Sequence, residues 1–196
     1  MSAEPTPFLG AKALAQTVAR LGAEVSADHP DGLVVVGVLK GGVCLVADLL
    51  RAITVPCVVD FFALSPYAGE RARVRVLKDV DLDVRDLDVV LVEDVVDTGL
   101  SATYVLGLLE ARGARRVSVC ALLDRPARRI VPLAPTYVGV VAPEEFLVGY
   151  GLDAAERYRN VPDLWVIDPS GLESDRGGFD RAFYPAAGYR SSPSGR

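Results

Sequence analysis

Four short runs of apolar, mostly β-branched residues constrain the fold of this chain more than any other feature. The runs cover residues 33–39, 55–64, 89–92 and 117–123, and Tyr137–Val141 adds a fifth. Each is apolar at almost every position, whereas a strand with one face in water would alternate apolar and polar residues. The runs therefore predict strands that are buried on both faces of a sheet.

Segments with helical spacing separate these strands. Ala11–Val25 carries apolar residues three or four positions apart, Val43–Ile53 follows the turn Lys40-Gly41-Gly42, and Ala102–Arg112 lies between two of the runs. Alternation of strands and helices predicts an α/β fold with a parallel sheet, right-handed crossovers and ligands at the carboxyl ends of the strands.

Size and charge limit the possible functions. A chain of 196 residues, 51% of them hydrophobic, suits one domain with a full core. The net charge of −5 provides no general attraction for nucleic acid or for an anionic membrane, so any bound phosphate must be held locally. From Ser170 onward the composition shifts to Gly, Ser, Arg and Pro, and we expect a domain over residues 1–169 followed by a mobile tail over 170–196.

The cysteines and the first residues bear on location. Cys44, Cys57 and Cys120 lie in apolar runs without metal-binding spacing, as in proteins of a reducing compartment. The N-terminus lacks the basic start and apolar core of a signal peptide, and no apolar stretch reaches the ~18 residues needed to cross a bilayer. We expect a soluble cytoplasmic protein that binds no membrane.

The most informative stretch for chemistry covers residues 89–103. A buried strand leads into Glu93 and Asp94, Asp97 follows, and a Thr-Gly-x-Ser turn at residues 98–101 opens a helix. The first turn of a helix presents unpaired N–H groups and a positive dipole end, which together suit a phosphate group. Taken singly, these residues are ordinary helix caps and strand ends, but two acids ending a buried strand are costly unless a cation or sugar hydroxyls receive them.

Residues 92–99, Val-Glu-Asp-Val-Val-Asp-Thr-Gly, resemble the phosphoribosyl-pyrophosphate signature of type I phosphoribosyltransferases. Other stretches resemble the bacterial hypoxanthine-guanine phosphoribosyltransferases in order and spacing, and the similarity spans about residues 10–168. These stretches are residues 38–42, 47–49, 59–61, 121–126 and 145–153.

The resemblance implies the type I phosphoribosyltransferase fold, a central mainly parallel sheet flanked by helices, with a small hood over the carboxyl ends of the strands. It also implies a hypoxanthine (6-oxopurine) phosphoribosyltransferase of purine salvage. Such an enzyme transfers 5-phosphoribosyl from phosphoribosyl pyrophosphate to the purine with the help of Mg²⁺, and it releases pyrophosphate.

The resemblance also implies roles for individual residues. The 5′-phosphate would lie on residues 97–101, the ribose hydroxyls on the two adjacent acids, and the pyrophosphate on a loop that often has a cis peptide bond between Leu39 and Lys40. The residues implied for phosphoribosyl pyrophosphate are Lys40, Gly41, Glu93, Asp94, Asp97, Thr98, Gly99, Leu100, Ser101 and Arg159.

The same resemblance assigns the purine, the metal and the general base. Phe146 would stack on the purine, the Leu147 backbone would read its edge, and Arg125 would donate to its 6-oxygen. Asp97 would accept the purine N7 proton as general base, within hydrogen-bond reach of the base. The residues implied for Mg²⁺ are Glu93, Asp94 and Asp153.

Two features depart from the family. The mobile loop over residues 65–79 begins with Ser65-Pro66-Tyr67 in place of a Ser-Tyr pair and is shorter than usual. Arg125 stands where the family generally has a lysine, and a guanidinium presents its donors in a different geometry. The preference among hypoxanthine, guanine and xanthine therefore stays open.

Two other functions stay open as well. A regulatory RNA-binding protein of the same fold would need a basic face, which the acidic composition does not predict. A phosphoribosyltransferase that acts on another acceptor in a biosynthetic pathway fits the two departures. The expected partners are phosphoribosyl pyrophosphate and a 6-oxopurine, with no nucleic acid, and the resemblance suggests a homodimer or homotetramer.

Overall fold

The computed structural model describes residues 4–65, 75–174 and 179–184. The chain divides into two compact units. The large unit holds residues 15–143, and the small unit holds the described residues of 1–14 and 144–196.

The large unit is built on a six-stranded sheet in the order β4-β3-β2-β5-β6-β7. All neighbouring strands are parallel except β4, which is antiparallel to β3. This arrangement confirms the α/β fold with a mainly parallel sheet. The strands are β2 (Leu33–Leu39), β3 (Cys57–Leu64), β4 (Val76–Lys78), β5 (Asp88–Val96), β6 (Arg116–Asp124) and β7 (Tyr137–Val141).

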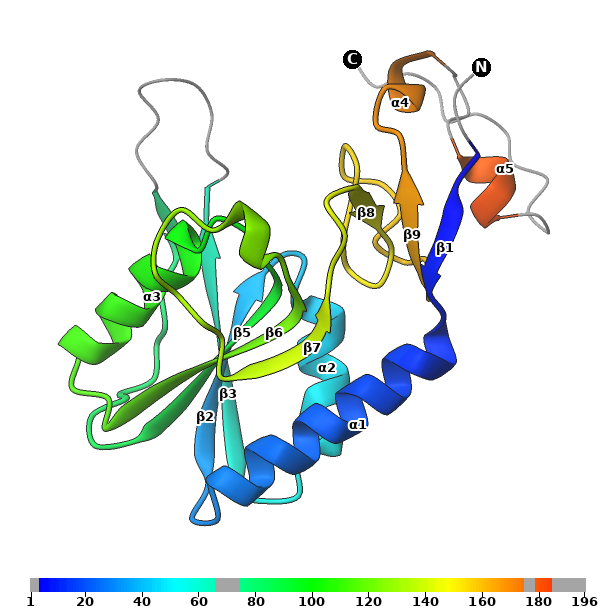
Figure 1. The fold of residues 1–196 in the computed structure, drawn as a ribbon. Helices are drawn as coiled ribbons and strands as arrows, with labels where there is room; N and C mark the ends of the chain where they lie inside the picture. The colour runs from blue at the N-terminus through cyan, green and yellow to red at the C-terminus, as the bar shows by residue number, and fades with distance from the viewer. Residues whose placement is uncertain (1–3, 66–74, 175–178, 185–196) are drawn as a thin grey trace. The chain divides into compact units, whose positions relative to one another are not determined.

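Helices cover both faces of this sheet. Figure 1 shows α3 (Leu100–Ala111) on one face and α2 (Val43–Ala52) on the other. Helix α1 (Ala11–Asp28) begins in the small unit and continues into the large unit beside α2. A single turn of 3₁₀ helix, η1 (Pro126–Arg128), follows β6.

The central strands explain why the sequence runs are apolar throughout. Val34 and Leu91 pack with α3 in one core cluster. Val35 and Val90, which point to the opposite face, are fully buried as well. Because both faces are covered, an alternating pattern would leave polar groups in the core.

Strand β5 is longer than the apolar run that predicts it. It continues through Glu93 to Val96, with Glu93 opposite Ala121 of β6. The two acids thus lie within the strand rather than after it, because backbone pairing with β6 continues past them.

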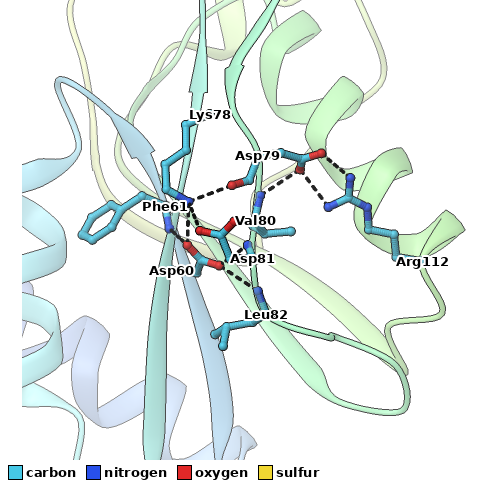
Figure 2. Close-up of polar contacts among 8 residues, drawn as sticks. All are labelled: Asp60, Phe61, Lys78, Asp79, Val80, Asp81, Leu82 and Arg112. Carbon is cyan, nitrogen blue, oxygen red and sulfur yellow. Dashed lines mark hydrogen bonds and ion pairs between the residues drawn. The ribbon is translucent and has the colours of Figure 1, made fainter.

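Residues 78–82 are tied to β3 by a buried carboxylate, as Figure 2 shows. Asp60 is 8% exposed and accepts hydrogen bonds from the N–H groups of Asp81 (2.6 Å) and Leu82 (3.0 Å). Lys78 Nζ donates to the other carboxylate oxygen at 3.0 Å. Next to this cluster, Asp79 forms an ion pair with Arg112 after α3. Val80 follows and is buried in the core.

We expect Asp60→Asn to destabilise the protein by about 1–2 kcal/mol at neutral pH. Burial raises the pKa of Asp60, but hydrogen bonds from Lys78 and from backbone N–H groups outweigh it and lower the pKa from 3.8 to about 2. The stabilisation by the ionised group is therefore present above about pH 4 and is lost as the pH falls towards 2. Urea unfolding at pH 7 and pH 3 measures the difference.

The control for this prediction is Asp83→Asn. Hydrogen bonds from its neighbour Arg85 also lower the pKa of Asp83 to about 2, but its side chain is 60% exposed. We expect a much smaller change there, since solvent screens exposed pairs. An equal loss of stability in the two variants, or a loss at Asp60 that does not shrink at low pH, would contradict the assignment.

The small unit contains a three-stranded antiparallel sheet in the order β1-β9-β8. Its strands are β1 (Thr6–Leu9), β8 (Phe146–Val148) and β9 (Leu164–Ile167). Two short helices, α4 (Gly171–Ser174) and α5 (Asp180–Phe183), lie in the segment predicted as a mobile tail, of which residues 175–178 and 185–196 fall outside the described part. Among the described helices, none has the length and apolarity to span a membrane.

Candidate active site

The turn between β5 and α3 forms the floor of a small polar cavity. Gly99, the N-cap residue of α3, has a φ of 82° and makes no side-chain capping bond, and the first turn of the helix carries no acidic residue. The N–H of Leu100 donates to the Thr98 hydroxyl at 3.4 Å. The first turn of a helix presents N–H groups that bonds within the helix leave unpaired, and such groups suit an anion. The cavity, of about 100 Å³, is lined by Glu93, Val95, Val96, Asp97, Thr98, Gly99, Ser101 and Ala102.

Glu93 brings a buried carboxyl group to this cavity. It is 5% exposed, and its Oε1 atom is buried without a hydrogen-bond partner. Burial, and then the charge of Asp94, raise the pKa of Glu93 well above its ordinary value. A buried oxygen without a partner is costly, so Glu93 suits a ligand hydroxyl or a cation.

The loop after β2 meets these acids at the carboxyl ends of two neighbouring strands. The peptide bond between Leu39 and Lys40 is cis, as the resemblance implies. Gly41 lies so close to Asp94 that a Cβ atom on it would stand 1.6 Å from Asp94 Oδ2. The structure therefore brings the predicted pyrophosphate loop beside the predicted ribose-binding acids.

The segment after β6 holds the backbone around Asp97. Arg129 Nη1 donates to the carbonyl oxygens of Val96 (3.0 Å) and Asp97 (2.6 Å), and its Nη2 pairs with Asp124. The N–H of Ile130 donates to the Thr98 carbonyl at 2.9 Å. The backbone of the turn is thereby fixed from two sides.

The Asp97 carboxylate itself is one-third exposed and has a cation beside it. Arg128 Nε lies 3.1 Å from Asp97 Oδ1. The two groups form an ion pair, but their geometry is not that of a hydrogen bond. Sequence reasoning singled out neither Arg128 nor Arg129. In the sequence, only their position just after Arg125-Pro126 could have indicated a role in the site. Adjacent arginines in a loop are ordinarily surface cations.

Arg125 lies at the carboxyl end of β6, next to this turn. The residue is 9% exposed, and its N–H donates to the Val96 carbonyl at 3.0 Å. A guanidinium so deeply buried at a strand end is unusual for a surface cation and suits a role in ligand binding.

The small unit carries the remaining predicted residues. Phe146 is 41% exposed on β8, whereas its neighbour Leu147 is buried opposite Val166 of β9. Asp153 Oδ1 pairs with Arg159 Nη2 at 2.8 Å. The structure thus pairs Asp153 with Arg159. The resemblance implies different roles for them, Mg²⁺ for Asp153 and pyrophosphate for Arg159.

The loop that carries Asp153 is strained. Four residues other than glycine have a positive φ, which costs ~1–3 kcal/mol each in the left-handed region. Such a conformation persists only where surrounding contacts hold it. The four are Tyr150 (47°), Ala155 (51°), Glu156 (63°) and Tyr158 (75°).

The predicted metal ligands do not all belong to the same unit. Glu93 and Asp94 belong to the large unit, whereas Asp153 belongs to the small unit. Within the described residues, no three His, Cys, Asp or Glu side chains gather into a metal-binding cluster. Ser65 follows β3 and receives a hydrogen bond from the N–H of Arg75 on its Oγ (3.1 Å), while Tyr67 lies outside the described residues.

Comparison with known proteins gives consistent matches. The model of the phosphoribosyl transferase domain matches residues 8–155. The hypoxanthine-guanine phosphoribosyltransferase of Bacillus subtilis is 37% identical over 161 residues, which cover 80% of this chain and 89% of the relative. The bifunctional protein TilS/HprT of Listeria innocua is 39% identical over 160 residues, but the chain spans only 25% of its length.

A solved structure matches as well. A crystal structure of a hypoxanthine-guanine phosphoribosyltransferase from Bacillus anthracis has 35% sequence identity and a TM-score of 0.80. The match covers 83% of this chain and 98% of that one.

Proposed function

Because this chain belongs to the phosphoribosyl transferase family, we propose that it transfers 5-phosphoribosyl from phosphoribosyl pyrophosphate to a 6-oxopurine, hypoxanthine above all. The products are the nucleoside monophosphate and pyrophosphate, as in purine salvage. The observation that carries the proposal is the turn at residues 97–101, which opens helix α3, with the buried carboxyl of Glu93 in the same cavity.

The reaction needs charge stabilisation more than covalent help. Displacement at C1′ builds positive charge on the ribose, while pyrophosphate leaves with negative charge. Residues 97–101 would hold the 5′-phosphate, and Glu93 and Asp94 would orient the ribose hydroxyls beside the cationic sugar. Asp97 would accept the N7 proton of the purine as its N9 bonds to C1′.

Further residues would bind the pyrophosphate and the purine. Lys40, Gly41 and Arg159 would receive the pyrophosphate, and Arg125, Phe146 and Leu147 would bind the purine. The buried Arg125 and the exposed Phe146 ring support this proposal, because a donor and a stacking surface are what a 6-oxopurine requires.

The carboxylates fit Mg²⁺, which prefers oxygen ligands and is commonly held by one or two carboxylates together with substrate phosphates. Glu93, with its unpartnered oxygen, Asp94 and Asp153 would supply these ligands. When bound, Mg²⁺ neutralises charge on the pyrophosphate. We further propose a homodimer or homotetramer, and a cytoplasmic location in keeping with the free thiols of Cys44, Cys57 and Cys120.

The test is pyrophosphate release from phosphoribosyl pyrophosphate in the presence of hypoxanthine, guanine, xanthine, adenine or uracil. We expect release with 6-oxopurines only, no activity after exhaustive chelation, and recovery with Mg²⁺ or Mn²⁺. Full activity without a divalent cation would contradict the metal-assisted mechanism. Release with a different acceptor alone would point to the biosynthetic-pathway alternative.

Gly41→Ala should impair substrate binding without unfolding the protein. The new methyl group must displace the Asp94 carboxylate, since their separation would be 1.6 Å, but that carboxylate is the end of a flexible side chain and can move. Loss of one hydrogen bond to a charged group predicts a rise of ~10-fold or more in KM for phosphoribosyl pyrophosphate. Gly107→Ala, where a methyl group would meet nothing within 4 Å, is the control and should leave KM unchanged.

A further inference from the structure

The segment 179–184 packs into the core of the small unit. Phe179 is 6% exposed and belongs to the same core cluster as Tyr158. The ring of Phe183 lies 5.0 Å from that of Tyr158 and 5.5 Å from that of Trp165, in edge-to-face geometry in both cases. These contacts make the segment part of the hydrophobic core, although it lies beyond the stretch that resembles the family.

Polar contacts attach the same segment to the strained loop. Asp180, whose side chain is 3% exposed, forms an ion pair with Arg157. The N–H of Phe179 donates to the Tyr158 hydroxyl at 3.2 Å. The guanidinium of Arg157 also lies 5.0 Å over the Tyr158 ring. The segment thus holds two consecutive residues of the loop, and one of them, Tyr158, has a left-handed backbone.

A third contact lies on the far side of Arg159. The Tyr184 hydroxyl donates to Asn160 Oδ1 at 2.6 Å. Asp180 and Tyr184 line a cavity of about 380 Å³ together with residues 156–160. The residues on both sides of Arg159 are therefore held by the segment, and Arg159 in turn pairs with Asp153.

We propose that residues 179–184 are a positioning element for the loop that carries Asp153 and Arg159. Left-handed residues need contacts that hold them, and the segment gives Tyr158 a hydrogen bond and two aromatic contacts. It also holds the neighbours of Tyr158 and Arg159, through the ion pair with Arg157 and the hydrogen bond to Asn160. The consequence for catalysis rests on the proposed function, in which Arg159 and Asp153 serve pyrophosphate and Mg²⁺. The segment itself touches no substrate.

The experiment compares Asp180→Asn and Phe183→Ala with Ala182→Ser, a change at an exposed position of the same helix. KM and kcat are measured with phosphoribosyl pyrophosphate. Fluorescence of Trp165, the single tryptophan of the chain, reports the packing of the segment. Trypsin cleavage after Arg157 and Arg159 reports the order of the loop.

We expect a rise of ~10-fold or more in KM for phosphoribosyl pyrophosphate in both variants, with kcat within about 3-fold, because binding contacts are loosened while the general base is untouched. Tryptic cleavage should accelerate, and Phe183→Ala should shift the Trp165 emission to longer wavelength. Ala182→Ser should match the parent chain in every measurement.

Two results would overturn the positioning role. One is unchanged cleavage and KM in both variants. The other is faster cleavage with unchanged KM, which would reduce the segment to packing. Failure of the positioning role can be told apart from failure of the proposed function. If the parent protein has no activity on any base, fluorescence and tryptic cleavage of the variants still test the packing of the segment.

Discussion

Asp97→Asn should lower kcat by ~10²-fold or more while KM for phosphoribosyl pyrophosphate changes little. An asparagine has nearly the same shape but cannot accept the N7 proton. The backbone of residue 97 is held through its carbonyl by Arg129, at 2.6 Å, and this bond does not depend on the side chain. The turn at residues 97–101 should therefore keep its conformation.

Steady-state kinetics and binding of phosphoribosyl pyrophosphate measure this effect, with Asp83→Asn as the control at an exposed carboxylate of the same unit. Unchanged kcat would remove Asp97 from proton transfer. A large rise in KM alone would instead make Asp97 a binding residue. Arg128 lies 3.1 Å from the carboxylate, so Arg128→Gln additionally tests whether that cation positions the Asp97 side chain.

The large unit could be predicted from sequence because its central strands β2, β5 and β6 are buried on both faces, whereas β3 exposes Val58 (52%) and Val59 (40%), contrary to the prediction for that run. Leu33–Leu39 coincides with β2, and the apolar runs at 89–92 and 117–123 lie within β5 and β6. The ends of the strands were harder to predict. Backbone pairing carries β5 past Glu93, and side-chain polarity contains no information about that pairing.

The small unit was largely beyond sequence reasoning. Its strands β1 and β9 are each four residues long and come from opposite ends of the chain. No local sequence pattern therefore predicts their pairing. Strand β4 was missed for a related reason, because its three residues lie in a polar segment. Composition alone suggested a mobile tail, whereas Phe179 and Asp180 are buried.

The candidate site also has a part that could be predicted from sequence and a part that could not. Residues 93–101 could be predicted because strand, acids, glycine and helix are contiguous in sequence, although their roles remain predictions. The support from Arg129 depends on contacts between residues about thirty positions apart. The strain at Ala155 and Tyr158 involves residues that ordinarily avoid a positive φ, and only the structure reveals it.

We expect the base preference to follow from hydrogen-bond parity at Arg125, in its proposed role beside the purine 6-oxygen. A guanidinium has only donors, so it satisfies the 6-oxygen of hypoxanthine but meets the 6-amino group of adenine donor to donor. Adenine also lacks the N1 proton that the Leu147 carbonyl would accept. Arg125 is 9% exposed, so water cannot easily compensate for a mismatch there.

Each buried group left unsatisfied costs ~1–3 kcal/mol, so two mismatches predict kcat/KM for adenine at least ~10²-fold below that for hypoxanthine.

Arg125→Ala should lose much of this ratio, mainly through a fall in activity on hypoxanthine. Arg125→Lys should retain most of it, because a lysine ammonium also carries only donors and meets the 6-amino group of adenine donor to donor. The measurement is kcat/KM for both bases in the three proteins. Adenine or a non-purine acceptor that serves the parent enzyme as well as hypoxanthine would contradict the salvage assignment, since a buried donor-only side chain at this position would then have no 6-oxygen to recognise.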